Sequence, residues 1–557
     1  MKSRRAASAW VSGAAAALML IAGCSGTSGG GERASDPTTD QDTTINGTLP
    51  DDGPPQDGGI LRTNVAADAP TLDPHKSASY SVPSVVTSTV YSKLVEFKTS
   101  RDLPYGSMEV RPDLAESWEQ SEDGLTWTFH LRKGVKYHNI APVNGREFTS
   151  ADVACTIDRI QNLPGVQKNL LDVVEKLETP DPYTAVFRMT VPYPTFDETM
   201  ASFYMPMLPC EGTRGEFNLA EQAIGTGPFI LQRWDRKVEQ DFVKNPDYFI
   251  AGKPHLDGFK VVVMADPASA IAAMRTGELD YTTSVNETLL PSVVGSNPEL
   301  VVRNYLVFGP NQIMFNQDKP PFNDYRVRKA IAMAFDRNGM GEQFYDGHYR
   351  VAGPIPSTLF GGLPADEAEE LIPYDPEGAK KLLAEAGYPN GLNVQMLTTD
   401  GYSPQFLNQA QWVQQDLKDI GVNVELKVID YASYFSAFGA KDYDIGWGLS
   451  TAFLTADEWL QALYMSDGPR NWFGTNDPKL DQMITEQRST LDKNEREQKL
   501  LEINRYILEN VLSPFMGIQY SSLLTQHPWV HNLYLHPAYS RSYLTDVWLD
   551  PDAPTRR

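Results

Sequence analysis

Amphipathic helices and alternating strands succeed one another along most of this chain. The clearest pair begins at Ser403 and Pro404, an N-cap residue and a first-turn proline, and the helix ends at Gly421. Its apolar stripe is Phe406, Ala410, Val413, Leu417 and Ile420, and the strand that follows alternates at Val422, Val424, Leu426 and Val428. Helices that alternate with strands in this way indicate α/β architecture.

Three further helices and a hairpin are predicted by the same reasoning. One helix begins at Asp324, and another begins at Asp375 and stops at Gly387. Thr149 and Asp152 have the spacing of a capping box, which predicts a helix start there. Residues 125–131 alternate, 132–134 form a turn and 135–137 resume the alternation, so we expect a hairpin over this stretch.

The first residues have the pattern of an export signal. Positive charge at Lys2, Arg4 and Arg5 precedes a short apolar stretch over 14–21, which falls short of the roughly 20 residues needed to span a bilayer. We therefore expect residues 1–23 to be removed. Residues 25–58 are dominated by Gly, Ser, Thr, Asp and Pro. Such a segment cannot bury enough apolar surface to fold, so within 24–58 we expect the residues after Cys24 to form a flexible tether.

Length and charge narrow the possible functions of the remaining body. About 500 residues exceed what one hydrophobic core usually serves, so at least two domains are expected. Lys and Arg total 48 against 72 Asp and Glu, a net charge of −24, which argues against nucleic acid as a partner. Ten Trp, 25 Tyr and 23 Phe suit both packed cores and a ligand cleft lined by flat side chains.

No catalytic or metal-binding pattern stands out. His527, His531 and His536 are interrupted by prolines, which argues against the helical spacing of metal ligands. After residue 58, the sequence contains neither a Gly-x-Ser-x-Gly elbow nor a phosphate-binding Walker loop. We therefore expect neither an enzyme nor a metal or cofactor, with a secreted hydrolase as a distant alternative.

Two cysteines remain once Cys24 is set aside. Cys155 and Cys210 are either bridged, as an oxidising compartment favours, or buried as separate thiols, and both alternatives stay open.

The motifs along the chain resemble a known family. Leu20 to Cys24 resembles the bacterial lipobox, whose cysteine is lipidated and becomes the mature N-terminus. The body resembles extracellular solute-binding protein family 5, the oligopeptide, dipeptide and nickel binders. The matching stretches are 70–75, 111–118, 123–129, 131–135, 148–153, 225–229, 277–280, 322–331 and 374–388, in family order.

This resemblance implies a fold and a set of partners. It implies a periplasmic-binding-protein-like fold of two lobes with a cleft and a hinge. Lobe one would comprise 59–92, 206–308 and 520–550, with an extra subdomain over 93–205, and lobe two would comprise 309–519. The hinge would lie near Val307 and Gln519. It further implies a monomeric lipoprotein held at the outer face of a membrane through Cys24, which delivers an oligopeptide or another organic solute to an ABC permease and its ATPase.

The resemblance also places ligand contacts on lobe two. Relatives receive the peptide amino group on an aspartate in a Trp-x-Ala-Asp-Tyr stretch, but here Trp447 is followed by Ser450 at the aspartate position. Two alternatives follow. Either Asp457 takes the place of that aspartate after a local insertion, or the ligand carries no ammonium group and needs only the hydroxyl of Ser450. We favour the second alternative. Strand-end hydrogen bonding is the alternative for Ser450, and core packing is the alternative for Trp447.

On the opposite wall, Ser79 and Tyr80 follow the Leu72-Asp73-Pro74 stretch where relatives contact ligand, although a surface position also suits Tyr80. Asn316 ends a predicted strand and faces the cleft or forms a turn.

Overall fold

The structure is a computed structural model. It describes residues 42–51, 53–76, 82–103, 107–164, 166–307, 309–401, 404–449, 453–514, 516–536 and 542–554. The described residues belong to one compact unit, residues 37–557. No helix among the described residues is long and apolar enough to cross a membrane.

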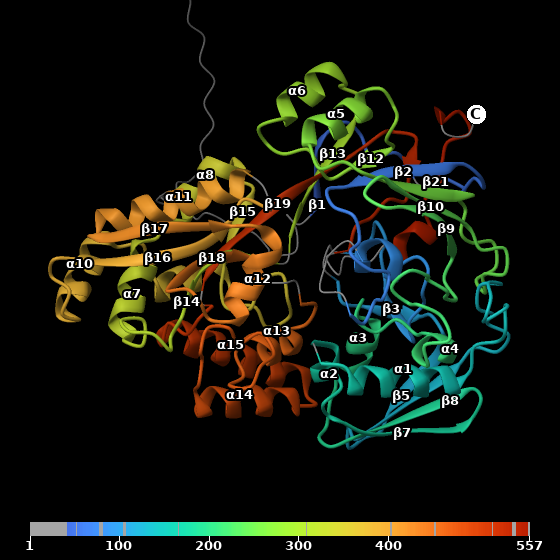
Figure 1. The fold of residues 1–557 in the computed structure, drawn as a ribbon, viewed down its shortest axis with the longest axis horizontal. Helices are drawn as coiled ribbons and strands as arrows, with labels where there is room; N and C mark the ends of the chain where they lie inside the picture. Colours follow the sequence, from blue (N-terminus) through green and yellow to red (C-terminus); the bar gives the residue numbers. More distant parts are fainter. Residues whose placement is uncertain are drawn as a thin grey trace, which may run out of the picture. The chain divides into compact units, whose positions relative to one another are not determined.

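A mixed sheet runs through both halves of the described chain (Figure 1). Its strands, in spatial order, are β1 (Asp42–Asn46), β13 (Val301–Leu306), β19 (Gly517–Gln526), β14 (Asn311–Phe315), β18 (Ile445–Leu449), β16 (Leu392–Thr399) and β17 (Val422–Ile429). Two short strands, β12 (Tyr281–Thr282) and β15 (Tyr349–Ala352), also pair with β19. The parallel pairing of β16 with β17 and β18 is the arrangement that connecting helices require.

Two smaller four-stranded sheets belong to the first half of the chain. One has the order β2 (Ile60–Val65), β11 (Gly258–Val263), β10 (Glu239–Lys244) and β9 (Phe229–Asp235). The other has the order β5 (Ala115–Gln120), β6 (Thr126–Leu131), β8 (Thr184–Met189) and β7 (Val174–Asp181). Two-stranded pairs join β3 (Val95–Phe97) to β4 (Val110–Pro112) and β20 (Val530–His531) to β21 (Trp548–Leu549).

Helices cover these sheets. In the first half they are α1 (Ser150–Asn162), α2 (Val166–Leu170), α3 (Phe196–Ala201), α4 (Cys210–Thr213), α5 (Pro267–Arg275) and α6 (Leu290–Ser296), with a π-helical turn at Val82–Thr87. In the second half they are α7 (Tyr325–Ala334), α8 (Arg337–Tyr345), α9 (Ala365–Leu371), α10 (Pro376–Glu385), α11 (Pro404–Asp419), α12 (Tyr431–Gly439), α13 (Ala456–Leu463), α14 (Pro478–Arg488) and α15 (Lys493–Glu509), followed by a 3₁₀ turn at Ser542–Thr545.

The predicted α/β fold and its best-patterned elements are confirmed. All five apolar positions of the α11 stripe are buried, which explains why that stripe predicted the helix. Asp324 and Asp375 cap α7 and α10 by accepting main-chain hydrogen bonds, and Thr149 and Asp152 form the expected capping box of α1.

Two expectations from the sequence are wrong. The strand at 126–131 pairs with the preceding strand β5 and with the distant strand β8 rather than with 135–137. Part of the expected tether, 25–58, forms β1, which pairs with β13 while Ile45 packs against the apolar cluster of α5 and α6. One apolar residue and the free edge of a sheet thus suffice to order a segment of low apolar content.

The buried apolar residues show which parts of the chain share a core. One cluster fills the β14–β18 sheet and its helices α7, α10 and α11. Another lies under the β2–β11 sheet. The largest cluster begins in residues 94–207 and continues into α12, α13, α14 and α15, so the first and second halves of the chain meet in a continuous apolar contact.

Candidate ligand-binding region

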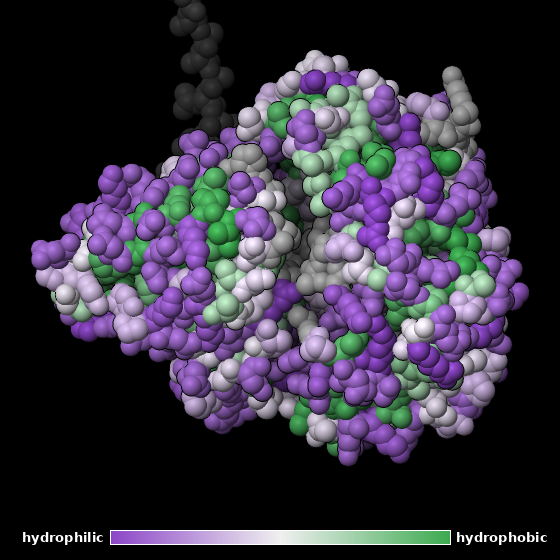
Figure 2. Space-filling model, in the orientation of Figure 1, coloured by the Kyte–Doolittle hydropathy of each residue, from purple (hydrophilic) through white to green (hydrophobic). Residues whose placement is uncertain are grey.

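β19 is the strand that the two halves share. Its first residues, Gly517–Tyr520, pair with β14 and β15, and its remaining residues, Ser521–Gln526, pair with β13. β19 is thus one connection between the halves, and the second runs from β13 to β14. The two connections are hydrogen-bonded to each other, because Val307 N donates to Tyr520 O at 3.0 Å. The space-filling view shows a furrow between the half that carries β16–β18 and the half that carries β2 and β11 (Figure 2). Two chain connections between the halves, next to a furrow, are the arrangement that hinge closure uses.

Acidic side chains gather where residues 93–205 meet α13, α14 and α15. Asp457 and Glu458 occupy the first turn of α13, and both are buried. Glu198 of α3 lies near them, since its carboxylate repels that of Glu458. A small cavity of about 40 Å³ lies here, with Thr195, Glu198, Asp457, Gln487 and Arg496 in its walls. The cavity is large enough for little more than a water molecule, so in this conformation the region is closed.

The charge of Asp457 is already compensated within the protein. Its Oδ1 accepts from Gln487 Nε2 at 2.8 Å, and its Oδ2 lies 3.1 Å from Arg488 Nε. These contacts fit a structural role better than direct capture of a ligand ammonium group, because a carboxylate held by a buried arginine has little charge left to offer.

Glu198 and Glu458 are different, because neither forms an ion pair with another residue of the described ranges. Burial raises the pKa of Glu458 to about 7, despite a hydrogen bond from Leu454 N at 2.8 Å. Burial, followed by repulsion from Asp197, raises the pKa of Glu198 to about 8. Both carboxyls therefore stand to gain from an added cation, which would restore their ionised form.

Four of the residues predicted from the sequence lie outside the described residues: Cys24, Ser79, Tyr80 and Ser450. The other predicted residues are placed. Trp447 on β18 has none of its surface exposed and packs among core aromatics, with ring centroids 5.8 Å from Phe335 and 6.2 Å from Phe406. This environment agrees with the core-packing alternative and offers a ligand no surface in this conformation.

Asn316 ends β14 and is also buried. Its Nδ2 donates to Lys441 O and to Tyr443 O, each at 3.0 Å, and its N donates to Asp444 O. These bonds tie the turn before β18 to the end of β14, so the side chain is occupied as the turn-forming alternative requires.

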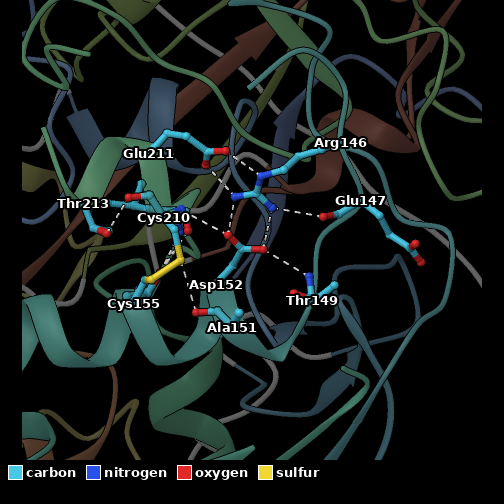
Figure 3. Close-up of a disulfide and its surroundings, with 11 residues drawn as sticks. Arg146, Glu147, Thr149, Ala151, Asp152, Cys155, Cys210, Glu211 and Thr213 are labelled. Carbon is cyan, nitrogen blue, oxygen red and sulfur yellow. Dashed lines mark hydrogen bonds and ion pairs between the residues drawn. A yellow bond between two sulfur atoms is a disulfide. The ribbon is translucent and has the colours of Figure 1, made fainter. Parts of the chain in front are cut away.

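Cys155 and Cys210 are bridged in the structure, with sulfur atoms 2.02 Å apart. The bridge joins α1 to α4 beside a network of charges (Figure 3). Arg146 makes a fork there: Nε donates to Glu211 at 2.7 Å and Nη1 donates to Asp152 at 2.9 Å. Asp152 in turn accepts from Cys210 N at 3.1 Å, so the disulfide and the ion pairs hold the same two helices together.

A cavity of about 840 Å³ opens beside this bridge. Its walls come from residues 71–76, from α1 and from residues 212–220, all in the first half of the chain. Movement of the second half would not enclose a ligand there. Arg159 and Asp73 in its wall also pair with each other at 2.6 Å, so we place the candidate ligand site in the acidic region around Glu198 and Glu458 instead.

Sequence reasoning missed Glu198, Gln487 and Arg488, which meet Asp457 and Glu458 only in the folded protein. No motif marks them, because they come from two helices, α3 and α14, that are far apart in the chain. Buried charge is their only signal, and burial cannot be read from these exposed-looking helical sequences. Within the described ranges, no group of three or more His, Cys, Asp or Glu side chains is arranged to hold a metal ion.

Comparisons with known proteins agree on the kind of protein. The family description "Bacterial extracellular solute-binding proteins, family 5 Middle" matches residues 109–471, which is more than half of the chain. The chain is 26% identical over 485 residues to di/tripeptide-binding protein 1 of Pseudomonas aeruginosa, a match that covers 81% of this chain and 87% of the relative.

Solved structures give the same result. The Helicobacter pylori periplasmic binding protein DppA, in complex with the peptide STSA, superimposes with a TM-score of 0.78 at 25% identity and covers 89% of this chain and 98% of its own. The binding protein AgaA from A. tumefacien R10, in complex with agropinic acid, gives 0.76 at 28% identity, covering 88% and 99%.

Two α/β halves joined by crossing strands, with a closed acidic region between them, define a two-lobed binding protein. The family match specifies which kind: this chain belongs to the bacterial extracellular solute-binding proteins, family 5. Members of this family are solute-binding proteins, not enzymes, and they work with ABC importers.

Proposed function

We propose that this chain captures short peptides outside the cytoplasm and delivers them to the permease of an ABC importer. The observation that carries the proposal is the family match, which spans more than half of the chain. The relative that binds di- and tripeptides and the neighbour that holds the peptide STSA support peptides as the ligand class.

The acidic region at the start of α13 supports a ligand with a positive charge. Glu198 and Glu458 lack ion-pair partners among the described residues, and burial holds the pKa of each carboxyl above its usual range. The ammonium group of a peptide would supply this positive charge, and Glu198 and Glu458 would receive it instead of the aspartate that relatives have at the position of Ser450. This proposal replaces the ligand without an ammonium group that the sequence alone favoured. A charge-assisted hydrogen bond in a closed cleft is stronger than one in water.

Calorimetry with trialanine and with N-acetyl-trialanine tests both parts of this proposal. We expect trialanine to bind and acetylation to weaken binding by about tenfold or more, the effect of one charge-assisted hydrogen bond. Equal affinity for the two peptides would contradict the ammonium contact and leave the peptide class standing.

Native mass spectrometry of protein purified from its own host tests the ligand class directly. A series of co-purified peptide masses is the expected result. A single discrete non-peptide mass would contradict the peptide proposal and favour another organic solute; the neighbour AgaA, for example, holds agropinic acid.

We also propose that the protein acts as a monomer anchored to the outer face of a membrane through a lipid on Cys24, and that it releases its ligand chemically unchanged. Replacement of Cys24 by Ala should move the protein from the membrane fraction into the soluble fraction, and mass spectrometry should find the lipid on the wild-type cysteine. An unmodified Cys24 in membrane-associated wild-type protein would contradict the anchor.

A further inference from the structure

The Arg488 guanidinium lies between the two halves of the chain. It ends α14, and only 5% of its side chain is exposed. Its Nη1 donates to Asp172 Oδ1 at 2.9 Å, its Nε lies 3.1 Å from Asp457 Oδ2, and its central carbon lies 4.8 Å from the ring centre of Tyr193. One side chain therefore makes three contacts that each favour its positive charge.

These contacts come from both sides of the region. Asp457 belongs to α13, in the same half as Arg488, and Gln487 also holds it there. Asp172 and Tyr193 belong to residues 93–205, in the other half. Around them, α2 packs against α13, and one apolar cluster contains both Phe196 of the first half and Trp459 of the second.

Separation of the halves would divide this set of contacts unequally. Arg488 would keep Asp457, because both lie in the second half, and would lose Asp172 and the Tyr193 ring. Asp172 is about half exposed, with 47% of its side chain accessible, so water can replace its contact in an open state. A buried arginine is stable only when its charge is matched, and closure supplies the second carboxylate.

Arg488 is also connected to the candidate ligand site. Asp457, with which it pairs, lies in the first turn of α13 next to Glu458, one of the two acids of the candidate site. The ion pair of Arg488 with Asp172 is therefore connected to the start of α13 through the second ion pair, with Asp457. No metal or cofactor is needed for this connection.

We propose that Arg488 is a positioning residue for ligand capture: on closure it pairs with Asp172 of residues 93–205 while holding Asp457, and so fixes the start of α13 against the ligand. The part of this inference that concerns ligand rests on the proposed function. The part that concerns closure depends only on the protein.

The variant Asp172→Asn tests the inference without a loss of fold, because Asp172 is half exposed. Glu178→Gln is a matched control, since Glu178 pairs with Lys176 and Arg188 inside the same subdomain and faces no residue of the second half in those contacts. Stopped-flow kinetics with trialanine should show dissociation about tenfold faster for Asp172→Asn, with association within about twofold, as expected when one closed-state contact is lost. Glu178→Gln should match the wild type.

Small-angle X-ray scattering of the ligand-free proteins provides a readout that does not require a ligand. We expect a larger radius of gyration for Asp172→Asn than for the wild type and for Glu178→Gln. Arg488→Lys keeps the charge but loses the fork that reaches two carboxylates, and it should lie between wild type and Asp172→Asn.

Unchanged scattering and unchanged dissociation for Asp172→Asn would overturn the inference, as would equal effects of Glu178→Gln. If the wild type binds no peptide, the proposed ligand class fails, while the scattering difference still decides whether Arg488 controls closure.

Discussion

The Gln519 side-chain amide donates to the main-chain oxygen of Val307, 2.8 Å away. The same Nε2 donates to Thr358 Oγ1 at 2.9 Å, and Gln519 has no exposed surface. Val307 and Gln519 stand on the two connections between the halves, at the point where β19 changes partners. One amide therefore ties both connections together.

Replacement of Gln519 by Leu should loosen this crossing. The variant keeps most of the volume but removes the donor, and a buried oxygen left without its partner costs about 1–3 kcal/mol. Urea unfolding should show that loss, and scattering should show a broader range of shapes without ligand. The control is Gln526→Leu, a buried amide on the same strand that donates to Val530 O at 2.9 Å. It should lose similar stability with no change in scattering, and a change as large as that of Gln519→Leu would contradict a special role for the crossing.

Trp447→Ala should act on stability rather than on ligand contact. The ring is fully buried between Phe335 and Phe406, and loss of a core aromatic costs about 3–5 kcal/mol. Thermal unfolding of the variant should therefore shift downward by several degrees. A variant that unfolds like the wild type but fails to bind trialanine would instead place Trp447 in the ligand site.

Glu458→Gln should change how stability depends on pH. Burial raises the pKa of Glu458 from 4.5 to about 7 in the folded protein. The unfolded chain therefore loses this proton first as the pH rises, so folding stability falls between about pH 4.5 and pH 7 and stays lower above. Glutamine has no proton to lose, so the variant should gain stability relative to wild type from pH 5 to pH 8, by up to about 3 kcal/mol. Chemical unfolding at several pH values measures this difference, and a constant difference would contradict the raised pKa.

Removal of the disulfide should destabilise the first half of the chain. The bridge closes a loop with a sequence separation of 55 residues, for which chain entropy gives about 4 kcal/mol. Replacement of both Cys155 and Cys210 by Ser should lower the free energy of unfolding by that order. The wild type treated with a reductant is a second test, and an unchanged melting temperature in both would mean that the ion pairs of Arg146 hold the helices alone.

The elements that the sequence predicted well are those whose signals are local. The α11 stripe and the capping residues Asp324, Asp375 and Thr149 each act within one helical turn of the element they start. The hairpin expected at 125–137 failed because the strand at 126–131 pairs instead with β5, which precedes it directly, and with β8, which is distant in sequence.

The candidate site was harder to predict for the same reason. Asp457 was found through a family motif, yet its partner Arg488 lies at the end of another helix and Glu198 lies on the far side of the chain. Whether a carboxylate is free or already paired depends on contacts that form only on folding. Composition and spacing could suggest an acidic ligand region, but they could not show which acids keep an unmatched charge.

The short strand β1 has a consequence for how the protein behaves in solution. It pairs with β13 at Thr44 and Arg303 and at Asn46 and Val302, and so covers the outer edge of the mixed sheet. An uncovered strand edge is a template for another chain. A protein that begins after residue 58 would therefore present β13 to its neighbours and should self-associate at high concentration, whereas the longer chain guards itself against aggregation.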